Sequence, residues 1–228
     1  MYPYYILNTN NFHSLIDGYT LPVQCTLDQV IQKDPSVSFF KKDIQNITNH
    51  IKYDLICESK KVQKGRAYNS DEIFDYFISI DEKNAYFNTI NNTFIIVSSR
   101  NIFNYFYRSF AKTSSNINNI FNKIDVNFVK IIDNQNHLGL QGVWLGDYGD
   151  NNIDALYLIG NKIEDSSQYQ QLIAKGATIS NVTIAYNYMN TLYKIMLTRD
   201  GGVILYSKLE PSDALPLIQD IYNKILSI

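Results

Sequence analysis

Apolar and polar residues alternate along several segments in the second half of the chain, and alternation at two-residue steps is typical of half-buried β-strands. The predicted strands lie at residues 126–132, 140–145, 153–159, 178–188, 191–198 and 203–207. The Arg-Asp-Gly-Gly link at residues 199–202 predicts a tight hairpin between the last two strands. A helix is predicted over residues 166–175, ending at Gly176, and another from Pro211 onward.

The first half of the chain mixes helical and strand periods. Apolar residues recur at steps of three and four over residues 37–51, which predicts a helix, and a second helix is predicted over residues 101–112. Strands are predicted at residues 4–8, 53–57, 73–80, 86–90 and 93–98. Asn91 and Asn92 tolerate the positive φ of a tight turn, so the last two strands are expected to form a hairpin. Residues 60–66 are rich in lysine and are predicted to form a loop.

The second half therefore has the predicted order β-β-β-α-β-β-β-α. Consecutive strands joined by short turns are antiparallel, and helices between groups of strands cover the sheet that those strands form. The expected fold class is α+β, mainly an antiparallel sheet with helices on one face. We expect a helix-richer N-terminal region at residues 1–124 and an antiparallel C-terminal region at residues 125–228, or one continuous domain built from both.

The overall charge argues against a dedicated nucleic-acid-binding protein. The 228 residues carry a formal net charge of −2, whereas affinity for nucleic acid comes largely from basic side chains that neutralise phosphates. One local patch has cations at Lys60, Lys61, Lys64 and Arg66 beside Tyr68. In a nucleic-acid-binding accessory protein the cations would contact phosphates and the tyrosine would stack on a base. A solvated loop is the alternative, and nucleic acid is not the favoured partner.

The chain shows no segment that points to a membrane or to secretion. No stretch approaches the ~20 consecutive apolar residues of a spanning helix, and the first residues lack the pattern of a signal peptide. Cys25 and Cys57 belong to no paired metal-binding motif, so reduced thiols and no metal site are expected. We therefore expect a cytoplasmic protein. The abundance of Asn, Ile, Lys and Tyr suggests an AT-rich genome, such as that of a low-GC bacterium, a phage or another mobile element.

Glu58 and Lys60 lie two residues apart at the end of a predicted strand, so alternation places both side chains on one face. Asp43 lies upstream in the predicted helix, with Asp34 as a second acidic candidate. Together these residues resemble the Asp…Glu-x-Lys core of the PD-(D/E)xK nuclease superfamily, over residues 34–60. The resemblance implies that Asp43 and Glu58 would bind Mg²⁺ and that Lys60 would stabilise developing charge. A surface ion pair between Glu58 and Lys60 is the alternative.

One predicted helix carries more aromatic side chains than a single buried stripe needs. Phe103, Phe106 and Phe110 follow steps of three and four and are assigned to the core. Tyr105 and Tyr107 flank that face, and tyrosine is enriched at protein interfaces. No phosphate-binding loop, nucleotide-binding glycine motif or hydrolase signature occurs in the sequence. We therefore favour a non-enzymatic module, without a cofactor, that self-associates or binds another protein through Tyr105 and Tyr107.

Overall fold

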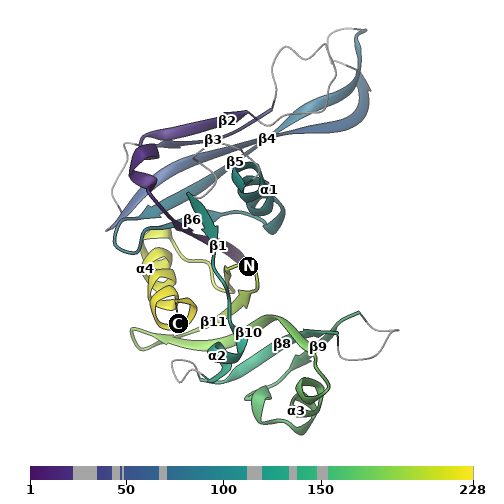
Figure 1. The fold of residues 1–228 in the computed structure, drawn as a ribbon, viewed down its shortest axis with the longest axis vertical. Coiled ribbons are helices and arrows are strands. Elements are labelled where there is room, and N and C mark those ends of the chain that lie inside the picture. Colours follow the sequence, from purple (N-terminus) through teal and green to yellow (C-terminus); the bar gives the residue numbers. More distant parts are fainter. Residues whose placement is uncertain are drawn as a thin grey trace. The chain divides into compact units, whose positions relative to one another are not determined.

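The computed structural model describes residues 1–22, 35–42, 47, 49–66, 71–111, 120–133, 138–147 and 154–227. These residues form two compact units, Asn8–Asn122 and Met1–Leu7 with Lys123–Ile228. In each unit the strands pair mainly antiparallel, as expected from the sequence (Figure 1). The expected placement of the helices on one face stays a prediction.

The sheet of the Asn8–Asn122 unit has the strand order β2-β3-β4-β5-β6, and each neighbouring pair is antiparallel. Its strands are β2 (Gly18–Pro22), β3 (Ser36–Lys41), β4 (His50–Arg66), β5 (Ile73–Asn88) and β6 (Thr93–Val97). The other elements are the 3₁₀ turn η1 (Phe12–Leu15), the helix α1 (Arg100–Ala111) and the short strand β7 (Phe121–Lys123) that leads out of the unit. The predicted hairpin between β5 and β6 is confirmed, and Asn92 in its turn has a φ of 52°.

A cluster of aromatic rings fills the core of this unit. Its members are Phe12, Phe39, Tyr53, Phe87, Phe94, Phe106, Phe110 and Phe121. All eight are buried, and neighbouring ring centroids lie 4.4 to 6.4 Å apart, which is the range of favourable aromatic pairs. The predicted core face of α1 is confirmed, because Phe103, Phe106 and Phe110 are its buried residues.

The predicted helix over residues 37–51 is wrong, because this stretch contains β3 and the start of β4. Val37 and Phe39 are fully buried two residues apart, whereas Phe40 is exposed, so the period of burial is two. The two buried residues pair with buried residues of β4, and this tertiary contact selects the strand. The predicted loop at residues 60–66 is also wrong, since these residues continue β4.

The second unit has the strand order β1-β12-β11-β10-β8-β9, again with antiparallel neighbours. Its strands are β1 (Tyr2–Thr9), β8 (Leu140–Gly146), β9 (Leu156–Ile159), β10 (Thr178–Tyr188), β11 (Thr191–Thr198) and β12 (Gly202–Leu205). Its helical elements are α2 (Phe128–Asp133), η2 (Ile163–Asp165), α3 (Ser167–Ala174), α4 (Pro211–Ile221) and the π-helical turn η3 (Tyr222–Leu226). None of the helices in the described part of the chain has the length and apolar character needed to cross a bilayer.

Two helices of this unit end or begin as the sequence predicts. The Oγ of Ser166 accepts a hydrogen bond from the backbone N–H of Tyr169 at 3.2 Å and so caps α3. Gly176 follows the end of α3 with a φ of 90°, the left-handed conformation that terminates many helices. Pro211 opens α4, because its fixed φ suits the first helical turn.

The predicted strand at residues 126–132 is wrong, because α2 occupies most of this stretch. The Oδ1 of Asn127 accepts a hydrogen bond from the backbone N–H of Lys130 at 3.1 Å, which satisfies one of the free amides of the first helical turn. Phe128 and Ile131 are then buried at a three-residue step. A helix therefore stands where the predicted order of the C-terminal half begins with a strand.

The predicted hairpin between β11 and β12 is confirmed, and Gly201 in its turn has a φ of 75°. A Cβ on Gly201 would lie 3.2 Å from the backbone oxygen of Ile6. We expect Gly201→Val to lower the free energy of unfolding by about 2 kcal/mol or more, because a β-branched residue is strained in this conformation and crowded here. Urea unfolding measures the change. Gly176→Val is the control, since its φ is also positive but no atom lies within 4 Å of an added Cβ; an equal loss in both variants would contradict the contribution of crowding.

Candidate functional site

Strands β4 and β5 continue beyond their neighbours in the sheet. The pairing of β3 with β4 reaches Cys57, and β6 pairs with β5 only from Asn84 onward. Beyond these positions β4 and β5 pair with each other alone among the strands that the structure describes. We call residues 58–66 and 73–80 the β4–β5 arm, which is the long hairpin at one end of the Asn8–Asn122 unit (Figure 1).

The β4–β5 arm carries large apolar side chains that are exposed. Of the seventeen such side chains among the described residues, six lie on the arm: Val62, Ile73, Phe74, Tyr76, Phe77 and Ile80. Val62 is 85% exposed and Ile80 is 59% exposed. Contiguous exposed apolar surface marks interaction sites on soluble proteins. The arm is therefore the candidate binding surface of this unit.

Strand alternation gathers several of these side chains on one face of the arm. Opposite residues of an antiparallel pair share a face, and Val62 lies opposite Tyr76 while Glu58 lies opposite Ile80. Lys60 belongs to the same face, and its Nζ lies 4.1 Å from the centroid of the Tyr76 ring. This cation–π contact covers part of the aromatic surface with the lysine side chain. The face is thus mainly apolar, with the cation of Lys60 held against it and the carboxylate of Glu58 at its base.

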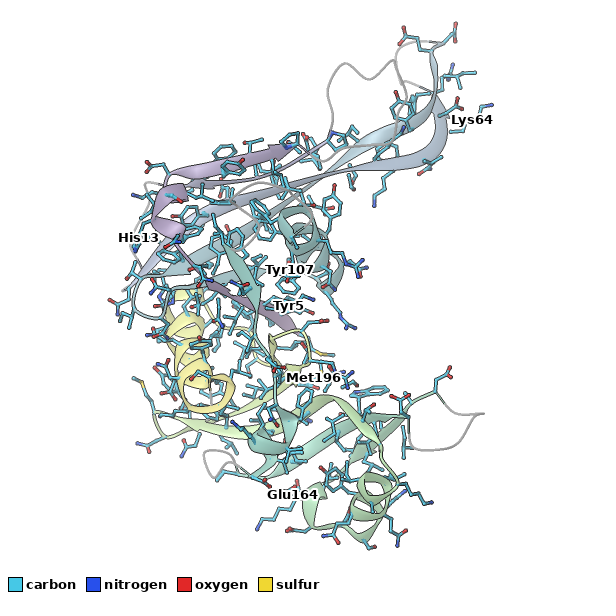
Figure 2. All side chains as sticks on the ribbon, viewed as in Figure 1. Tyr5, His13, Lys64, Tyr107, Glu164 and Met196 are labelled. Atoms are coloured by element: carbon cyan, nitrogen blue, oxygen red, sulfur yellow. The ribbon has the colours of Figure 1, made fainter. Side chains whose placement is uncertain are left out.

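A β-bulge interrupts the pairing of the arm between Val62 and Gly65. Lys64 lies in this bulge and is found near the far end of the arm (Figure 2). The ring of Phe74 lies over Gly65, because a Cβ on that glycine would approach the ring within 2.6 Å. Bulges change the direction of side chains near the edges of sheets. Because Gly65 has no side chain, the Phe74 ring can lie against its backbone.

The charges of the arm and its tip cancel. Between residues 58 and 80 the sequence has four basic residues and four acidic residues. They are Lys60, Lys61, Lys64 and Arg66, against Glu58, Asp71, Glu72 and Asp75. The Arg66 guanidinium pairs with the Asp71 carboxylate at 3.3 Å, with both side chains exposed, and such pairs contribute little stability. A locally neutral surface with exposed aromatic side chains suits a protein partner better than a phosphate backbone.

The four cations of the predicted basic patch therefore lie on β4, and four acidic residues lie in the same part of the chain. Tyr68, its proposed stacking residue, lies outside the described residues. The nucleic-acid interpretation stays a prediction, although the balance of charge at this position argues against it.

The residues of the nuclease resemblance are engaged in other contacts where the structure describes them. The Oε2 of Glu58 accepts hydrogen bonds from the backbone N–H and from the Oγ of Ser36, both at 2.9 Å. Lys60 contacts the Tyr76 ring. Asp34 and Asp43 lie outside the described residues. Within the described ranges no group of three or more His, Cys, Asp or Glu side chains is placed to hold a metal ion. A nuclease activity with Mg²⁺ stays an alternative prediction.

The two tyrosines predicted to contact a partner lie on α1. The Tyr105 hydroxyl donates a hydrogen bond to the backbone oxygen of Glu58 at 2.6 Å, and Tyr105 is half-buried. This bond ties α1 to the base of the β4–β5 arm. Tyr107 is also half-buried. Their contact with a neighbouring chain stays a prediction, and Tyr105 has a second role in supporting the arm.

Residues 73–80 of the arm were predicted as a strand, but the sequence did not indicate that this strand is exposed. Apolar residues occur at every second position from Phe74 to Ile80, but they alternate in the same way whether the strand is covered or exposed.

Comparison with models of known protein families gives no match, and no curated protein matches the chain in sequence.

Proposed function

We propose that this protein is a non-enzymatic, cytoplasmic interaction module that self-associates through the β4–β5 arm. The observation that carries the proposal is the group of six exposed apolar side chains on a locally neutral hairpin. A hairpin of this kind covers no core of its own. Burying its apolar face against another protein surface would remove that face from water, which is the main favourable contribution to most protein association.

The apolar face of the arm suits a second copy as the partner. Val62, Tyr76 and Ile80 lie on one face of the arm, and a second copy offers the same apolar face. A twofold rotation about an axis parallel to the strands of the arm stacks β4 of one copy over β5 of the other, about 10 Å apart as in packed sheets. The apolar faces of the two copies then meet. Twofold symmetric dimers are also the commonest oligomers.

The α1 helix supports the arm at its base. Tyr105 holds the backbone of β4 at Glu58, which is the first residue of the arm. A rigid hairpin loses less conformational entropy when it binds than a mobile one. Tyr107 remains the proposed additional contact of α1 with the partner.

Sedimentation velocity over a range of concentrations tests the proposal. We expect the wild-type protein to form dimers, and Ile80→Glu to weaken the association at least about tenfold, since it places a carboxylate in the apolar contact. Leu192→Glu is the matched control, because Leu192 is also 59% exposed but lies on β11 in the other unit. The control is expected to associate like the wild type.

Two results would overturn the proposal. One is a wild-type protein that stays monomeric at high concentration. The other is a dimer that Ile80→Glu and Leu192→Glu weaken equally, since the dimer would then not depend on the arm. Circular dichroism of each variant checks that the fold is retained, which is expected because both substitutions lie on exposed positions.

A further inference from the structure

The Lys123–Ile228 part of the chain contains an apolar groove that is separate from the arm. It has a volume of about 730 Å³ and lies among α2, η2, α3 and the start of β10. Phe128 and Tyr169 are buried in its floor, whereas Val129 and Ile173 are exposed at its surface. This volume is within the range of sites that bury small ligands or the side chains of a peptide.

The charged residues that line this groove are all acidic. They are Asp125, Asp133, Glu164 and Asp165, and no lysine or arginine occurs among the lining residues that the structure describes. The Oε2 of Glu164 accepts a hydrogen bond from the backbone N–H of Leu140 at 3.0 Å, which fixes that side chain at the edge of the groove. Burial raises the pKa of the Tyr169 hydroxyl, and the negative charges of Glu164 and Asp133 raise it further. The groove therefore combines apolar surface with a negative potential.

We propose that the groove between α2 and α3 binds a short amphipathic segment of a partner protein that carries lysine or arginine beside apolar residues. The apolar side chains of the segment would contact Phe128, Val129 and Ile173. Its cations would face Asp125, Asp133 and Asp165 at the edge. An acidic or purely polar segment would leave these carboxylates facing like charge or leave the apolar floor uncovered, so charge complementarity selects a basic one. This inference does not rest on self-association through the arm, because the groove and the arm belong to different units.

Binding of two labelled peptides to the full chain tests the proposal by fluorescence polarisation. The first probe is a short peptide of leucine and lysine, and the second has glutamate in place of each lysine. We expect the lysine peptide to bind, the glutamate peptide to fail, and added salt to weaken binding because screening reduces the attraction between exposed charges. Ile173→Ser and the double variant Asp125→Asn with Asp133→Asn are each expected to weaken binding about tenfold or more.

A matched control separates the groove from the overall negative charge of the protein. Glu210→Gln removes a carboxylate that is exposed, lies outside the groove and makes no capping hydrogen bond with its side chain. This variant should bind like the wild type. Equal binding of both peptides, or equal weakening in Glu210→Gln and in the Asp125 and Asp133 double variant, would overturn the proposal. Repeating the titration with Ile80→Glu keeps the two proposals distinct, since that variant should still bind the lysine peptide.

Discussion

Replacing Phe94 with alanine is expected to lower the free energy of unfolding by about 3–5 kcal/mol, the range seen when large buried aromatic residues are truncated. Phe94 is fully buried on β6. Its ring centroid lies 5.2 to 6.0 Å from five other rings: Phe12, Phe39, Tyr53, Phe106 and Phe121. Removing the ring leaves a cavity and breaks all of these contacts together. The strand and the helix α1 both contribute to the cluster, so the surrounding side chains cannot collapse without moving the backbone.

Urea unfolding followed by circular dichroism measures this loss. Phe77→Ala is the matched control, because it removes the same ring from an exposed position on the β4–β5 arm. Because Phe77 also belongs to the proposed association surface, Phe40→Ala on β3 is a second control outside the arm. At a protein concentration where the chain is monomeric, we expect each control to change the free energy of unfolding by less than about 0.5 kcal/mol, as is usual at exposed positions. Equal losses in Phe94→Ala and in the controls would show that the aromatic cluster does not form the core of its unit.

The protein is also expected to lose stability steeply above about pH 9, because several buried acids hold their protons more tightly in the folded state. Burial and, after it, the charge of Asp81 raise the pKa of the Cys57 thiol from 9.0 to about 12, against the opposing charge of Lys83. Below pH 9 the thiol is protonated in both the folded and the unfolded chain, so its contribution to stability is complete. Above pH 9 the unfolded chain releases the proton first, and the equilibrium shifts toward unfolding. Three pH units correspond to at most about 4 kcal/mol by pH 12.

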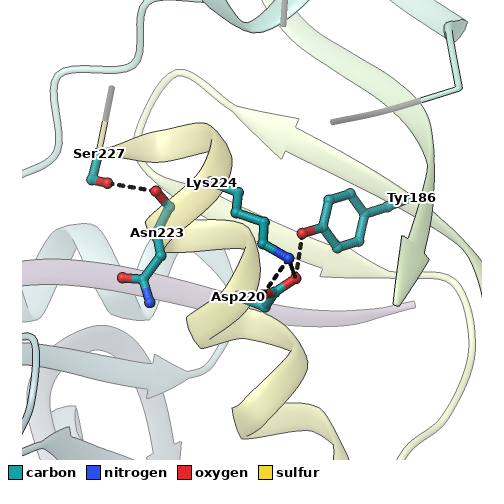
Figure 3. A network of polar contacts seen from close by, with 5 residues as sticks. All are labelled: Tyr186, Asp220, Asn223, Lys224 and Ser227. Atoms are coloured by element: carbon teal, nitrogen blue, oxygen red, sulfur yellow. Dashed lines mark hydrogen bonds and ion pairs between the residues drawn. The ribbon is translucent and has the colours of Figure 1, made fainter. Parts of the chain in front are cut away.

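Buried tyrosines extend this loss to higher pH. Burial raises the pKa values of Tyr53, Tyr86 and Tyr186 above 10. For Tyr186 the next causes are the hydrogen bond that its hydroxyl donates to Asp220 and the charge of that carboxylate, which also pairs with Lys224 on the same helical segment (Figure 3). The tyrosines therefore stabilise the fold fully below pH 10, and that contribution is lost as the pH rises through their folded pKa values.

Urea midpoints measured at intervals from about pH 8 to about pH 11 test this expectation. Cys57→Ala should flatten the decline between about pH 9 and pH 10, where the thiol titrates in the unfolded chain before the tyrosines do. Tyr186→Phe should leave that interval unchanged and flatten the decline above it. A wild-type stability that stays constant to pH 11 would contradict the burial of these groups.

The parts of the fold that depend on local chemistry were predictable. The two hairpin turns have positive φ at Asn92 and at Gly201, and few residue types tolerate it, so both hairpins were identified. The buried face of α1 was identified as well, because a helix with bulky residues at steps of three and four has one way to bury them.

The parts that depend on distant partners were not predictable. Over residues 37–51 the apolar residues fit a three-to-four-residue step as well as a two-residue step. Only the pairing of β3 with β4 decides between them. Residues 126–132 are an exception, because the hydrogen bond that the Asn127 side chain accepts from the backbone N–H of Lys130 is local and favours the helix. The candidate site was missed for a related reason. An exposed strand and a covered strand have the same alternation of apolar and polar residues, and the sequence of β4 and β5 does not indicate where the neighbouring strands β3 and β6 end.

The pairing of β1 with β12 imposes an order on how the chain is made and folded. Tyr2 lies opposite Leu205, so about 200 residues must be synthesised after β1 before its partner exists. At roughly 5–20 residues per second on the ribosome this interval is on the order of 10–40 s. The Asn8–Asn122 unit is complete well before then and can fold while β1 still lacks β12. Until β12 is made, the nascent chain therefore presents the side of β1 that later pairs with β12 to chaperones or to another nascent copy, and the second unit is completed only when β12 has left the ribosome.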